Sequence, residues 1–384
     1  MVNMSLSHIL LQLCCLKNRL TPPLSNLGLN KESRKNMQEK TMTIYDIAKE
    51  AGVSPATVSR VLTGNARVKE DKKEKILSII KENDFKPNAL ARSLINKATK
   101  TIGFIVPDIT NPFFSGVFLE AEKKALSLGY TMILCNSMND NKMNRTGVES
   151  LYLDMLREKQ VDGIVIMGGR ANEKKSGRGQ AEELKAITQK IPVVFINGAM
   201  SGVKSYHVAA DEKSGMQELI KYLAALGHKR VGFIGGRKGI TSTDIKHTAF
   251  LEAVKQGIFQ SKEEWLITSN FSVEDGYESM KKLLDCKELP TAVMAVNDFT
   301  AIGAINAAKD RGLRVPEDIS VTGFDGIYMT EAVRPRITTV SQNYMELGAK
   351  AIEIIDKLTL GEKVKRKYTV DTMVLIRDSC SSPS

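Results

Sequence analysis

A short segment near the N-terminus, "AGVSPATVSRVL" at residues 51–62, combines side chains that suit hydrogen bonding to DNA bases. Ser54 and Pro55 are typical of a helix N-cap and a first helical position. The apolar side chains that follow share one helix face at i, i+3 and i+4 spacing: Val58, Val61 and Leu62. The small Ala56 and the charged Arg60 therefore lie away from the apolar face. A small side chain lets a helix enter a major groove about 12 Å wide, where a guanidinium donates to guanine O6 and N7.

A second helix is expected directly before this segment, and the two together predict a helix-turn-helix. "TIYDIAKEA" begins at Thr43 and carries Asp46 three residues later, which is close to a capping box. Gly52 ends this helix and begins the turn. A third helix is expected at 69–83, where four apolar side chains are expected to close a small core: Ile76, Leu77, Ile79 and Ile80. A generic three-helix bundle is the alternative, although it does not explain the small exposed face of 51–62.

The net charge of the 384-residue chain is +11, from 55 basic and 44 acidic residues, and most of the excess is N-terminal. Residues 1–100 hold 18 Lys and Arg against 9 Asp and Glu, whereas the remainder holds 37 against 35. This distribution fits a solvated basic tail, and it equally fits a module that binds a polyanion such as nucleic acid. We expect residues 1–41 to be a disordered extension, with Met42 as the working start.

The segment "KPNALARSL" follows the third predicted helix. It is too short to form a stable isolated helix in water, and a linker would explain its length. A linker does not explain Leu90 and Leu94, which are spaced i, i+4. Leucines inserted between base steps of a minor groove would explain them, because such side chains kink the duplex. We therefore assign residues 88–100 to a hinge that contacts DNA.

From Thr101 onward, near-continuous apolar runs alternate with amphipathic segments, as expected of buried parallel strands and the helices between them. The predicted strands are 101–109, 131–137, 163–169, 192–198, 230–236, 292–298 and 319–326. The predicted helices are 113–129, 150–160, 213–227, 273–284 and 299–312. This order predicts an α/β core at 101–384 made of two subdomains with doubly wound parallel sheets.

Ligands of such sheets bind beyond the carboxyl ends of the strands. The side chains found there are aromatic rings, carboxylates and amides: Asp108, Phe113, Phe271, Asn297, Asp298 and Asp325, with the segment from Gly235 to Lys246. Rings stack on the apolar face of a sugar, and carboxylates and amides bind its hydroxyl groups. We therefore expect a small polyhydroxylated ligand, although each acidic residue taken singly could equally be a helix cap or a loop turn.

The stretch "TIYDIAKEAGVSPATVSRVLTGNARV", followed by "KPNALARSL", resembles the N-terminus of the LacI/GalR family of bacterial transcriptional regulators, and the likeness continues through nearly all of the remaining chain. The resemblance implies a small all-α helix-turn-helix headpiece at 42–87, a hinge helix that folds on operator DNA, and a periplasmic-binding-protein-like core. It places Pro55, Ala56 and Arg60 at base-reading positions and Leu94 at the minor-groove leucine. The full set of expected DNA contacts is Thr43, Ser54, Pro55, Ala56, Thr57, Ser59, Arg60, Asn65, Asn88, Ala91, Arg92 and Leu94.

The same resemblance implies an effector cleft in the core. The residues that align with positions usually lining that cleft are Phe113, Lys246, Phe271, Asp298 and Asp325. Asp108 and Asn297, at the ends of predicted strands, complete the expected effector site. Lys246 stands where many members have Arg, and Ala249 where Gly is usual. Because lysine lacks the bidentate geometry of a guanidinium, the resemblance leaves the ligand class open.

The sequence lacks the motifs of common enzyme classes and of metal sites. It contains no G-x-G-x-x-G after the first strand, no G-x-x-x-x-G-K-[ST] and no G-x-S-x-G. The 5 cysteines and 4 histidines show no metal-ligand spacing and no disulfide framework. No apolar run approaches the roughly 18–20 residues of a membrane span. We expect no catalytic residues, no cofactor, no metal and no membrane contact.

These observations predict a cytoplasmic homodimer that represses carbohydrate-related genes, binds palindromic operator DNA and responds to a small effector such as a sugar or sugar derivative. The alternative is an extracytoplasmic sugar-binding transport component with the same core, against which the helix-turn-helix and the missing signal peptide argue. A sugar-metabolising enzyme would need a catalytic constellation that the sequence lacks. The C-terminal "YTVDTMVLIRDSCSSPS" has no leucine heptads, which favours a dimer over a tetramer.

Overall fold

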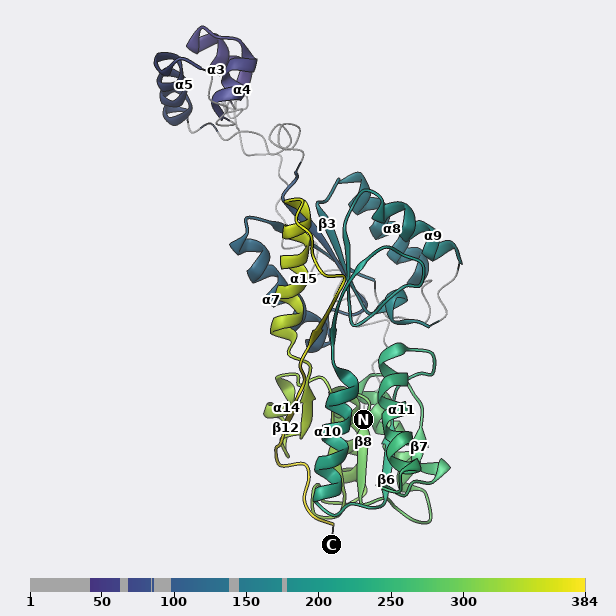
Figure 1. Cartoon of the computed structure of the whole chain (residues 1–384). Helices are drawn as coiled ribbons and strands as arrows, with labels where there is room; N and C mark the ends of the chain where they lie inside the picture. The colour runs from purple at the N-terminus through teal and green to yellow at the C-terminus, as the bar shows by residue number, and fades with distance from the viewer. Residues whose placement is uncertain are drawn as a thin grey trace, which may run out of the picture. The chain divides into compact units, whose positions relative to one another are not determined.

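The computed structural model describes residues 42–62, 68–83, 85, 98–137, 145–174 and 178–383 (Figure 1). The chain divides into two compact units, of which the first extends to Ile95 and the second begins at Asn96. This boundary falls inside the segment that the sequence assigns to a hinge. The expectations for residues 1–41 and for Asn65, Asn88, Ala91, Arg92 and Leu94 concern positions outside the described residues. Within the part of the chain that is described, no helix is both long and apolar enough to cross a lipid bilayer.

The described part of the N-terminal unit is helical: α3 (Ile44–Ala51), α4 (Pro55–Leu62) and α5 (Glu70–Glu82). Thr43 and Asp46 form the expected capping box. Thr43 Oγ1 accepts a hydrogen bond from Asp46 N at 3.3 Å, and Asp46 Oδ2 accepts one from Thr43 N at 2.9 Å. Gly52 follows α3 with a φ of 71°, a left-handed conformation that glycine adopts at little cost. The two helices and their turn therefore form where the sequence predicts them.

The core of this unit is small and involves all three helices: Ile47, Ala48, Ala51, Val58, Ile76 and Ile79 are buried. The expectation that Leu77 joins this core is wrong, because 45% of its surface is exposed. Residues 76, 79 and 80 share one face of α5, whereas residue 77 is rotated by about 100° from residue 76 and faces solvent. The apolar face of α5 is consequently narrower than its sequence indicates.

The C-terminal unit contains two parallel sheets, and each sheet with its helices is called a lobe below. The sheet of lobe 1 has the order β11-β5-β4-β3-β1-β2, and every neighbouring pair is parallel. Its strands are β1 (Thr101–Val106), β2 (Thr131–Asn136), β3 (Gly163–Met167), β4 (Val193–Ile196), β5 (Tyr206–Ala210) and β11 (Lys367–Val370). Its helices are α7 (Pro112–Ser127), α8 (Arg145–Glu158), α9 (Arg178–Thr188) and α15 (Tyr344–Thr359), with a short 3-10 helix η1 (Gly169–Asn172).

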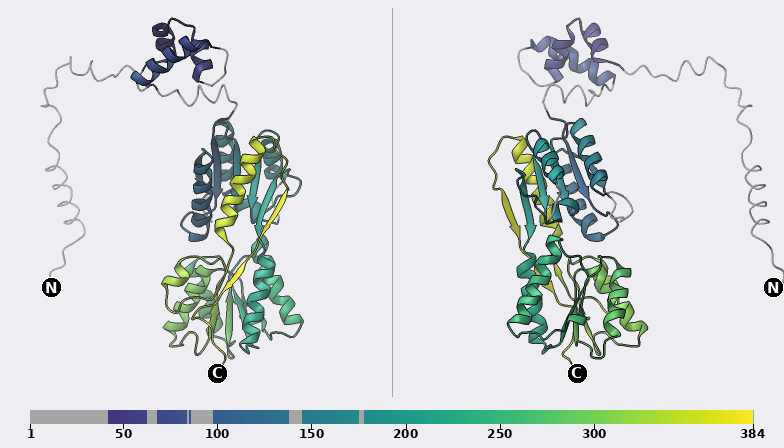
Figure 2. Two further views of the ribbon diagram at one scale, coloured as in Figure 1. Left: turned by 60° about the vertical axis from the view of Figure 1, so that its left-hand side comes forward. Right: turned by 90° about the vertical axis from the view of Figure 1, so that its right-hand side faces the viewer.

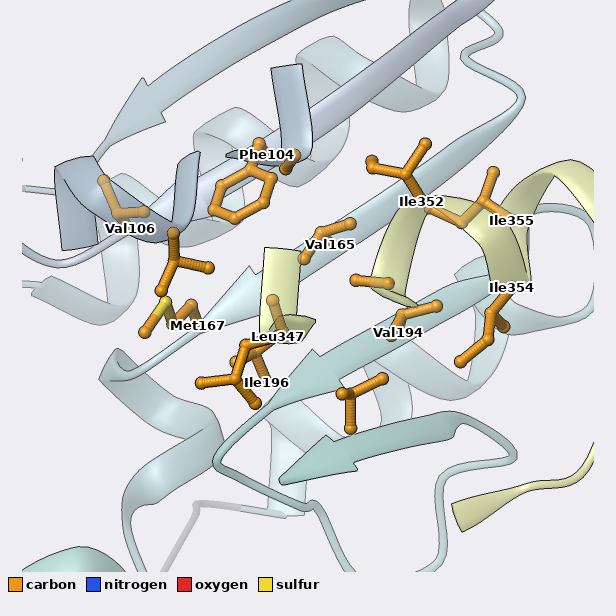
Figure 3. Close-up of a cluster of buried hydrophobic side chains, with 14 of the residues drawn as sticks. Phe104, Val106, Val165, Met167, Val194, Ile196, Leu347, Ile352, Ile354 and Ile355 are labelled. Carbon is orange, nitrogen blue, oxygen red and sulfur yellow. The ribbon is translucent and has the colours of Figure 1, made fainter. Parts of the chain in front are cut away.

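Both faces of the lobe 1 sheet are covered by helices. Phe104 and Val106 of β1 belong to the apolar cluster on the side of α7 and α15, whereas Ile105 belongs to the cluster on the side of α8 and α9. Figure 3 shows the first cluster, in which side chains of β1, β3 and β4 face Leu347 and Ile352 of α15. Burial on both faces explains why these strands appear in the sequence as continuous apolar runs.

Lobe 2 contains a smaller parallel sheet with the order β7-β6-β8-β9. Its strands are β6 (Val231–Ile234), β7 (Leu266–Ile267), β8 (Ala292–Ala295) and β9 (Ser320–Thr322). Its helices are α10 (Glu212–Ala225), α11 (Thr241–Lys255), α12 (Val273–Leu284), α13 (Asp298–Asp310) and α14 (Met329–Ala332), with the 3-10 helix η2 (Glu263–Trp265). Apolar clusters on the two faces of the sheet involve α12 and α13 on one side and α10 and α11 on the other.

The chain passes between the lobes more than once, as Figures 1 and 2 show. It leaves lobe 1 after β5, returns before α15, and leaves again after β11. An antiparallel pair, β10 (Thr339–Ser341) with β12 (Met373–Leu375), stands at these crossings. The predicted fold class is therefore confirmed: a helical N-terminal unit precedes a core of two doubly wound α/β lobes. The sequence did not predict the strands β5, β7 and β10 or the helices α9, α11, α14 and α15, whereas the C-terminal run that holds β11 and β12 is strand-like in its sequence.

Candidate functional site

The outer face of α4 carries side chains that the sequence predicts to contact DNA bases. Ala56 and Arg60 are exposed, whereas Val58 is completely buried. Ser54 Oγ accepts a hydrogen bond from Thr57 N at 3.3 Å, so the expected N-cap is formed. Among the other expected contacts, Thr43 is exposed and Pro55, Thr57 and Ser59 are half-buried. The apolar side chains of α4 thus pack inward, and Ala56 and Arg60 lie on its exposed face.

A cavity of about 510 Å³ lies between the two lobes. Its lining includes a residue beyond the carboxyl end of each of several strands: Asp108, Gly168, Asn197, Arg237, Asn297 and Asp325. Parallel strands end at one edge of each sheet, and in this unit the two edges face each other across the cavity. The position predicted for a ligand from strand order alone is therefore the position of the cavity.

The residues expected to bind an effector do not all reach this cavity. Asp108, Phe113, Lys246, Phe271, Asn297 and Asp325 line it, whereas Asp298 is absent from its lining among the described residues. Asp298 is 1% exposed, and its carboxylate accepts hydrogen bonds from Thr339 Oγ1 at 2.5 Å and from Ile327 N at 2.9 Å. Burial raises the pKa of this carboxyl to about 8, and Asp325 adds to the shift. Asp298 is therefore placed to join β10 and the segment after β9 to α13.

A buried charge cluster forms one wall of the cavity. The ammonium of Lys246 lies 3.4 Å from Glu212 Oε1 and 3.8 Å from Asp325 Oδ1, and it donates a hydrogen bond to Val296 O at 3.1 Å. The same ammonium lies 3.9 Å from the centroid of the Phe324 ring. Burial raises the pKa of the Glu212 carboxyl, and Lys246 opposes that shift. The positive charge of Lys246 is thus balanced by carboxylates of the protein itself.

Asp325 is held in an uncommon conformation by its neighbours. Its φ is 116°, a region that residues with a side chain rarely adopt and that often marks a functional site. Gln342 Nε2 donates to Asp325 Oδ1 at 2.6 Å, and Gln342 Oε1 accepts from Asn197 Nδ2 at 2.6 Å. Burial raises the pKa of Asp325 to about 6, while Lys246 and Gln342 lower it. These contacts join lobe 1, through Asn197, to the carboxylate in lobe 2.

Aromatic side chains supply the apolar part of the lining. They are Phe113 and Phe114 from lobe 1 and Phe271 and Phe299 from lobe 2. Asn297 Nδ2 donates to Phe271 O at 3.1 Å, and Asn297 Oδ1 accepts from Thr300 N at 2.8 Å at the start of α13. Asn297 therefore fixes the backbone beside one of these rings. Asp108 Oδ1 accepts from Thr110 N at 2.9 Å and from Thr110 Oγ1 at 2.6 Å.

The lobes also contact each other directly beside the cavity. Asn172 Nδ2 donates to Ser242 Oγ at 3.1 Å, and Ser242 N donates to Asn172 Oδ1 at 3.2 Å. Lys174 N donates to Gly239 O at 2.9 Å, and the Lys174 ammonium lies 2.8 Å from Asp244 Oδ2. Asn172 lines the cavity. These contacts hold the segment after β3 against the first turn of α11 and the glycine before it.

Several lining residues had no signal in the sequence. Glu212 and Gln342 lie where the chain crosses between the lobes, beside the short strands β5 and β10 that the pattern of apolar runs did not predict. Asn172 is the last residue of η1, a turn of 3-10 helix without periodicity of its own. Asn197 differs, because it lies near the end of the predicted strand 192–198 and directly beyond β4. Its position at the carboxyl end of a strand is the signal that could have identified it.

Family models match two parts of the chain. Residues 43–88 match the model described as "Bacterial regulatory proteins, lacI family", and residues 220–380 match that of a "Periplasmic binding protein-like domain". The fold is similar to that of the Lac repressor dimer bound to operator and the anti-inducer ONPF, with a TM-score of 0.76 at 23% identity, covering 89% of this chain and 100% of that one. A LacI family transcriptional regulator from Enterococcus faecium with bound ribose matches with a TM-score of 0.63 at 27% identity, covering 74% of this chain and 100% of that one.

Two curated relatives match along most of their length. The chain is 34% identical over 340 residues to the HTH-type transcriptional regulator DegA of Bacillus subtilis (strain 168), covering 88% of this chain and 98% of that protein. It is 34% identical over 346 residues to the HTH-type transcriptional repressor PurR of Haemophilus influenzae (strain PittEE), covering 88% of this chain and 99% of that protein. The chain therefore belongs to the LacI family of bacterial regulatory proteins, and it is a DNA-binding transcriptional regulator rather than an enzyme.

Proposed function

We propose that the chain is an operator-binding repressor whose DNA affinity is set by a small polyhydroxylated effector in the cavity between the lobes. The observation that carries the proposal is the lining itself, where aromatic rings lie beside buried carboxylates and amides. Rings contact the apolar face of a sugar, and Asp325 and Asn172 offer groups for its hydroxyls. The relative from Enterococcus faecium binds ribose, which supports a carbohydrate as the ligand here.

The DNA-binding surface is proposed to be the outer face of α4 together with the hinge. The proposed contacts are those predicted from the sequence. Among the described residues they are Thr43, Ser54, Pro55, Ala56, Thr57, Ser59 and Arg60, and beyond these they are Asn65, Asn88, Ala91, Arg92 and Leu94. Arg60 would read a base, because it is exposed next to the small Ala56. Two copies of the chain would bind one palindrome, with half-site centres about one helical turn apart. The regulated genes would concern carbohydrate use, and the protein would act in the cytoplasm, where the chromosome lies.

Coupling between the sites would act through the orientation of the lobes. Asn197, Gln342 and Asp325 form a continuous hydrogen-bonded path across the crossing segments. A ligand that contacts Asp325 in lobe 2 and Asn172 in lobe 1 would favour one lobe orientation over another. Such a ligand changes operator affinity only as far as it binds the two orientations with different affinities. A transport component, the alternative from the sequence, would have no use for the helix-turn-helix unit.

The test is a reciprocal titration. An operator is first selected from a random DNA pool with the full chain, and its affinity is measured by fluorescence anisotropy with and without ribose, glucose or other candidate sugars. Sugar affinity is then measured with and without that operator. Linkage requires that both titrations give one common coupling factor. A sugar that binds the chain but leaves operator affinity unchanged would contradict allosteric control by that class of ligand, and a chain that selects no specific DNA would contradict the operator-binding role.

A further inference from the structure

The charges that line the cavity are predominantly negative. Five carboxylates line it, against two cationic side chains: Asp108, Glu212, Glu274, Asp275 and Asp325, with Arg237 and Lys246. A charge inside a partly enclosed cavity interacts with its neighbours more strongly than it would in water, because the surrounding protein has a low dielectric constant. The lining therefore creates a field that opposes entry of an anion, unless one of the cations is positioned to bind it.

Lys246 is poorly placed to bind an anionic group. Its ammonium already contacts Glu212 and Asp325 and donates to Val296 O. Lys246, Glu212 and Asp325 are each more than nine-tenths buried, so their mutual contacts are screened little by water. A phosphate approaching Lys246 would also approach both carboxylates, and the cluster as a whole carries one more negative than positive charge when all three groups are ionised.

Arg237 is the other cation of the lining. Its guanidinium carbon lies 5.9 Å from the centroid of the Phe271 ring. Two of the five carboxylates, Glu274 and Asp275, lie in the first turn of α12, which follows Phe271 directly. An anion held by Arg237 would consequently meet these acidic groups on the same side of the cavity.

Helix N-termini also surround the cavity, and uncapped they would favour an anion. Most of these ends are capped from within the protein. At α7, Asn111 Oδ1 accepts from Phe113 N at 3.0 Å, and at α13, Asn297 Oδ1 accepts from Thr300 N. At α12, Ser272 Oγ accepts from Asp275 N at 3.1 Å. One backbone amide at each of these three ends is therefore already bound to a side-chain oxygen. The start of α11 has no cap from its own N-cap residue, but Ser242 N there donates to Asn172 Oδ1 of lobe 1 at 3.2 Å.

We propose that the effector is an uncharged or amine-bearing polyhydroxyl compound, and that the cavity discriminates against phosphorylated and carboxylated sugars. This inference rests on the proposed function and specifies its ligand class. Glu212 and Asp325 are the discriminating residues, because both are buried carboxylates in the lining and each can accept hydrogen bonds from a hydroxyl or an ammonium group. An added phosphate would be repelled by the same two groups.

The experiment compares matched ligands on the full chain by isothermal titration calorimetry. The sets are glucose, glucosamine and glucose 6-phosphate, then ribose and ribose 5-phosphate, then xylulose and xylulose 5-phosphate. In each set that binds, the neutral or amine-bearing member is expected to bind at least about tenfold more tightly than the phosphorylated one. A phosphorylated member that binds as tightly as its neutral counterpart overturns the charge inference alone. Absence of binding across all three sets counts against the proposed carbohydrate effector itself.

Variants assign the discrimination to named residues. Glu212→Gln removes one buried carboxylate, and it is expected to narrow the preference for neutral over phosphorylated ligands by about tenfold or more. Glu218→Gln, an exposed change on the same helix α10, is the matched control and should leave the preference unaltered. Because Glu212→Gln disturbs a buried pair, Glu274→Lys at the exposed start of α12 serves as a second variant and should narrow the preference in the same direction. An unchanged preference in both cavity variants would overturn the assignment.

Discussion

Gln342 donates a 2.6 Å hydrogen bond to Asp325, and through this bond a segment that crosses between the lobes holds a carboxylate of the cavity. The other end of the Gln342 side chain accepts from Asn197 in lobe 1. One amide therefore contacts both lobes at once. A change in lobe orientation that moves Asn197 away from Asp325 alters at least one of these two bonds, so Gln342 is positioned to relate the cavity to the shape of the core.

Gln342→Leu tests this relationship. The change leaves Asn197 Nδ2 and Asp325 Oδ1 without their partner, and an unsatisfied buried polar group costs roughly 1–3 kcal/mol. We expect the free energy of unfolding to fall by about that amount and the effect of a bound sugar on operator affinity to diminish. Urea denaturation measures the first quantity, and the reciprocal titration measures the second. Gln217→Leu, on the exposed face of α10, is the control. A Gln342→Leu protein with a full-sized coupling factor would show that the bond plays no part in communication.

Asp298→Asn tests the pH dependence of stability. The pKa of Asp298 is raised from 3.8 to about 8 in the folded protein, so between those values the folded state binds more protons than the unfolded state. The free energy of unfolding attributable to this group therefore falls as pH rises from about 4 to about 8. Asparagine can still accept from Ile327 N and donate to Thr339 Oγ1 without carrying a charge. We expect the variant to lose less stability than the natural protein between pH 6 and pH 8, as measured by urea denaturation at each pH.

The control for this experiment is Asp154→Asn, an exposed change on α8. This variant should lose as much free energy of unfolding between pH 6 and pH 8 as the natural protein does. Asp325, whose pKa is raised to about 6, contributes a fall in stability of the same sign mainly below pH 6. Equal pH profiles for the natural protein and Asp298→Asn would mean that Asp298 does not titrate in this range.

Arg60→Ala tests base reading by α4. A side chain that donates to a base contributes roughly 1–3 kcal/mol of discrimination, so affinity for the selected operator should fall by that amount while affinity for random DNA changes little. Lys75→Ala on α5 is the matched control. It should either lower the affinities for operator and for random DNA by the same factor or leave both unchanged. Fluorescence anisotropy at one fixed salt concentration gives all four values. Equal losses on operator and random DNA would place Arg60 on the phosphate backbone instead.

Gly303→Ala tests the close approach of two helices that support the cavity. A methyl group on Gly303 of α13 would collide with the Val273 carbonyl oxygen and lie 2.6 Å from Tyr277 N, both in α12. Overpacking of this kind costs typically about 1–3 kcal/mol, and we expect the melting temperature to fall accordingly. Gly179→Ala, where a methyl group would meet nothing within 4 Å, should be neutral or slightly stabilising. Similar melting temperatures for both variants would contradict the described packing.

The sequence by itself determined those helices and strands whose capping residues or apolar runs match their burial in the folded protein. Thr43, Asp46 and Gly52 are neighbours in sequence, and their capping and turn roles depend on backbone conformations within a few residues. The central strands of the two lobes, such as β1 and β3 in lobe 1 and β6 and β8 in lobe 2, are buried on two faces, so their apolar runs stand out from the helices around them. Strand order then predicted where a cavity would lie, because the carboxyl ends of parallel strands share one edge.

Only the tertiary structure decided which polar side chains share the cavity. Asp298 and Asp325 both lie at the ends of predicted strands, yet Asp298 faces Thr339 and Ile327 in the interior while Asp325 lines the cavity. Glu212 and Gln342 join the lining because the chain crosses between the lobes beside it, at β5 and β10, whose sequences YHVAA and TVS hold no continuous apolar run. Capping and periodicity act between residues near in sequence, whereas Thr339 lies 41 positions from Asp298 and Gln342 lies 145 positions from Asn197. Such contacts form only once the chain has folded, and the contact between Asn197 and Gln342 requires that both lobes have met.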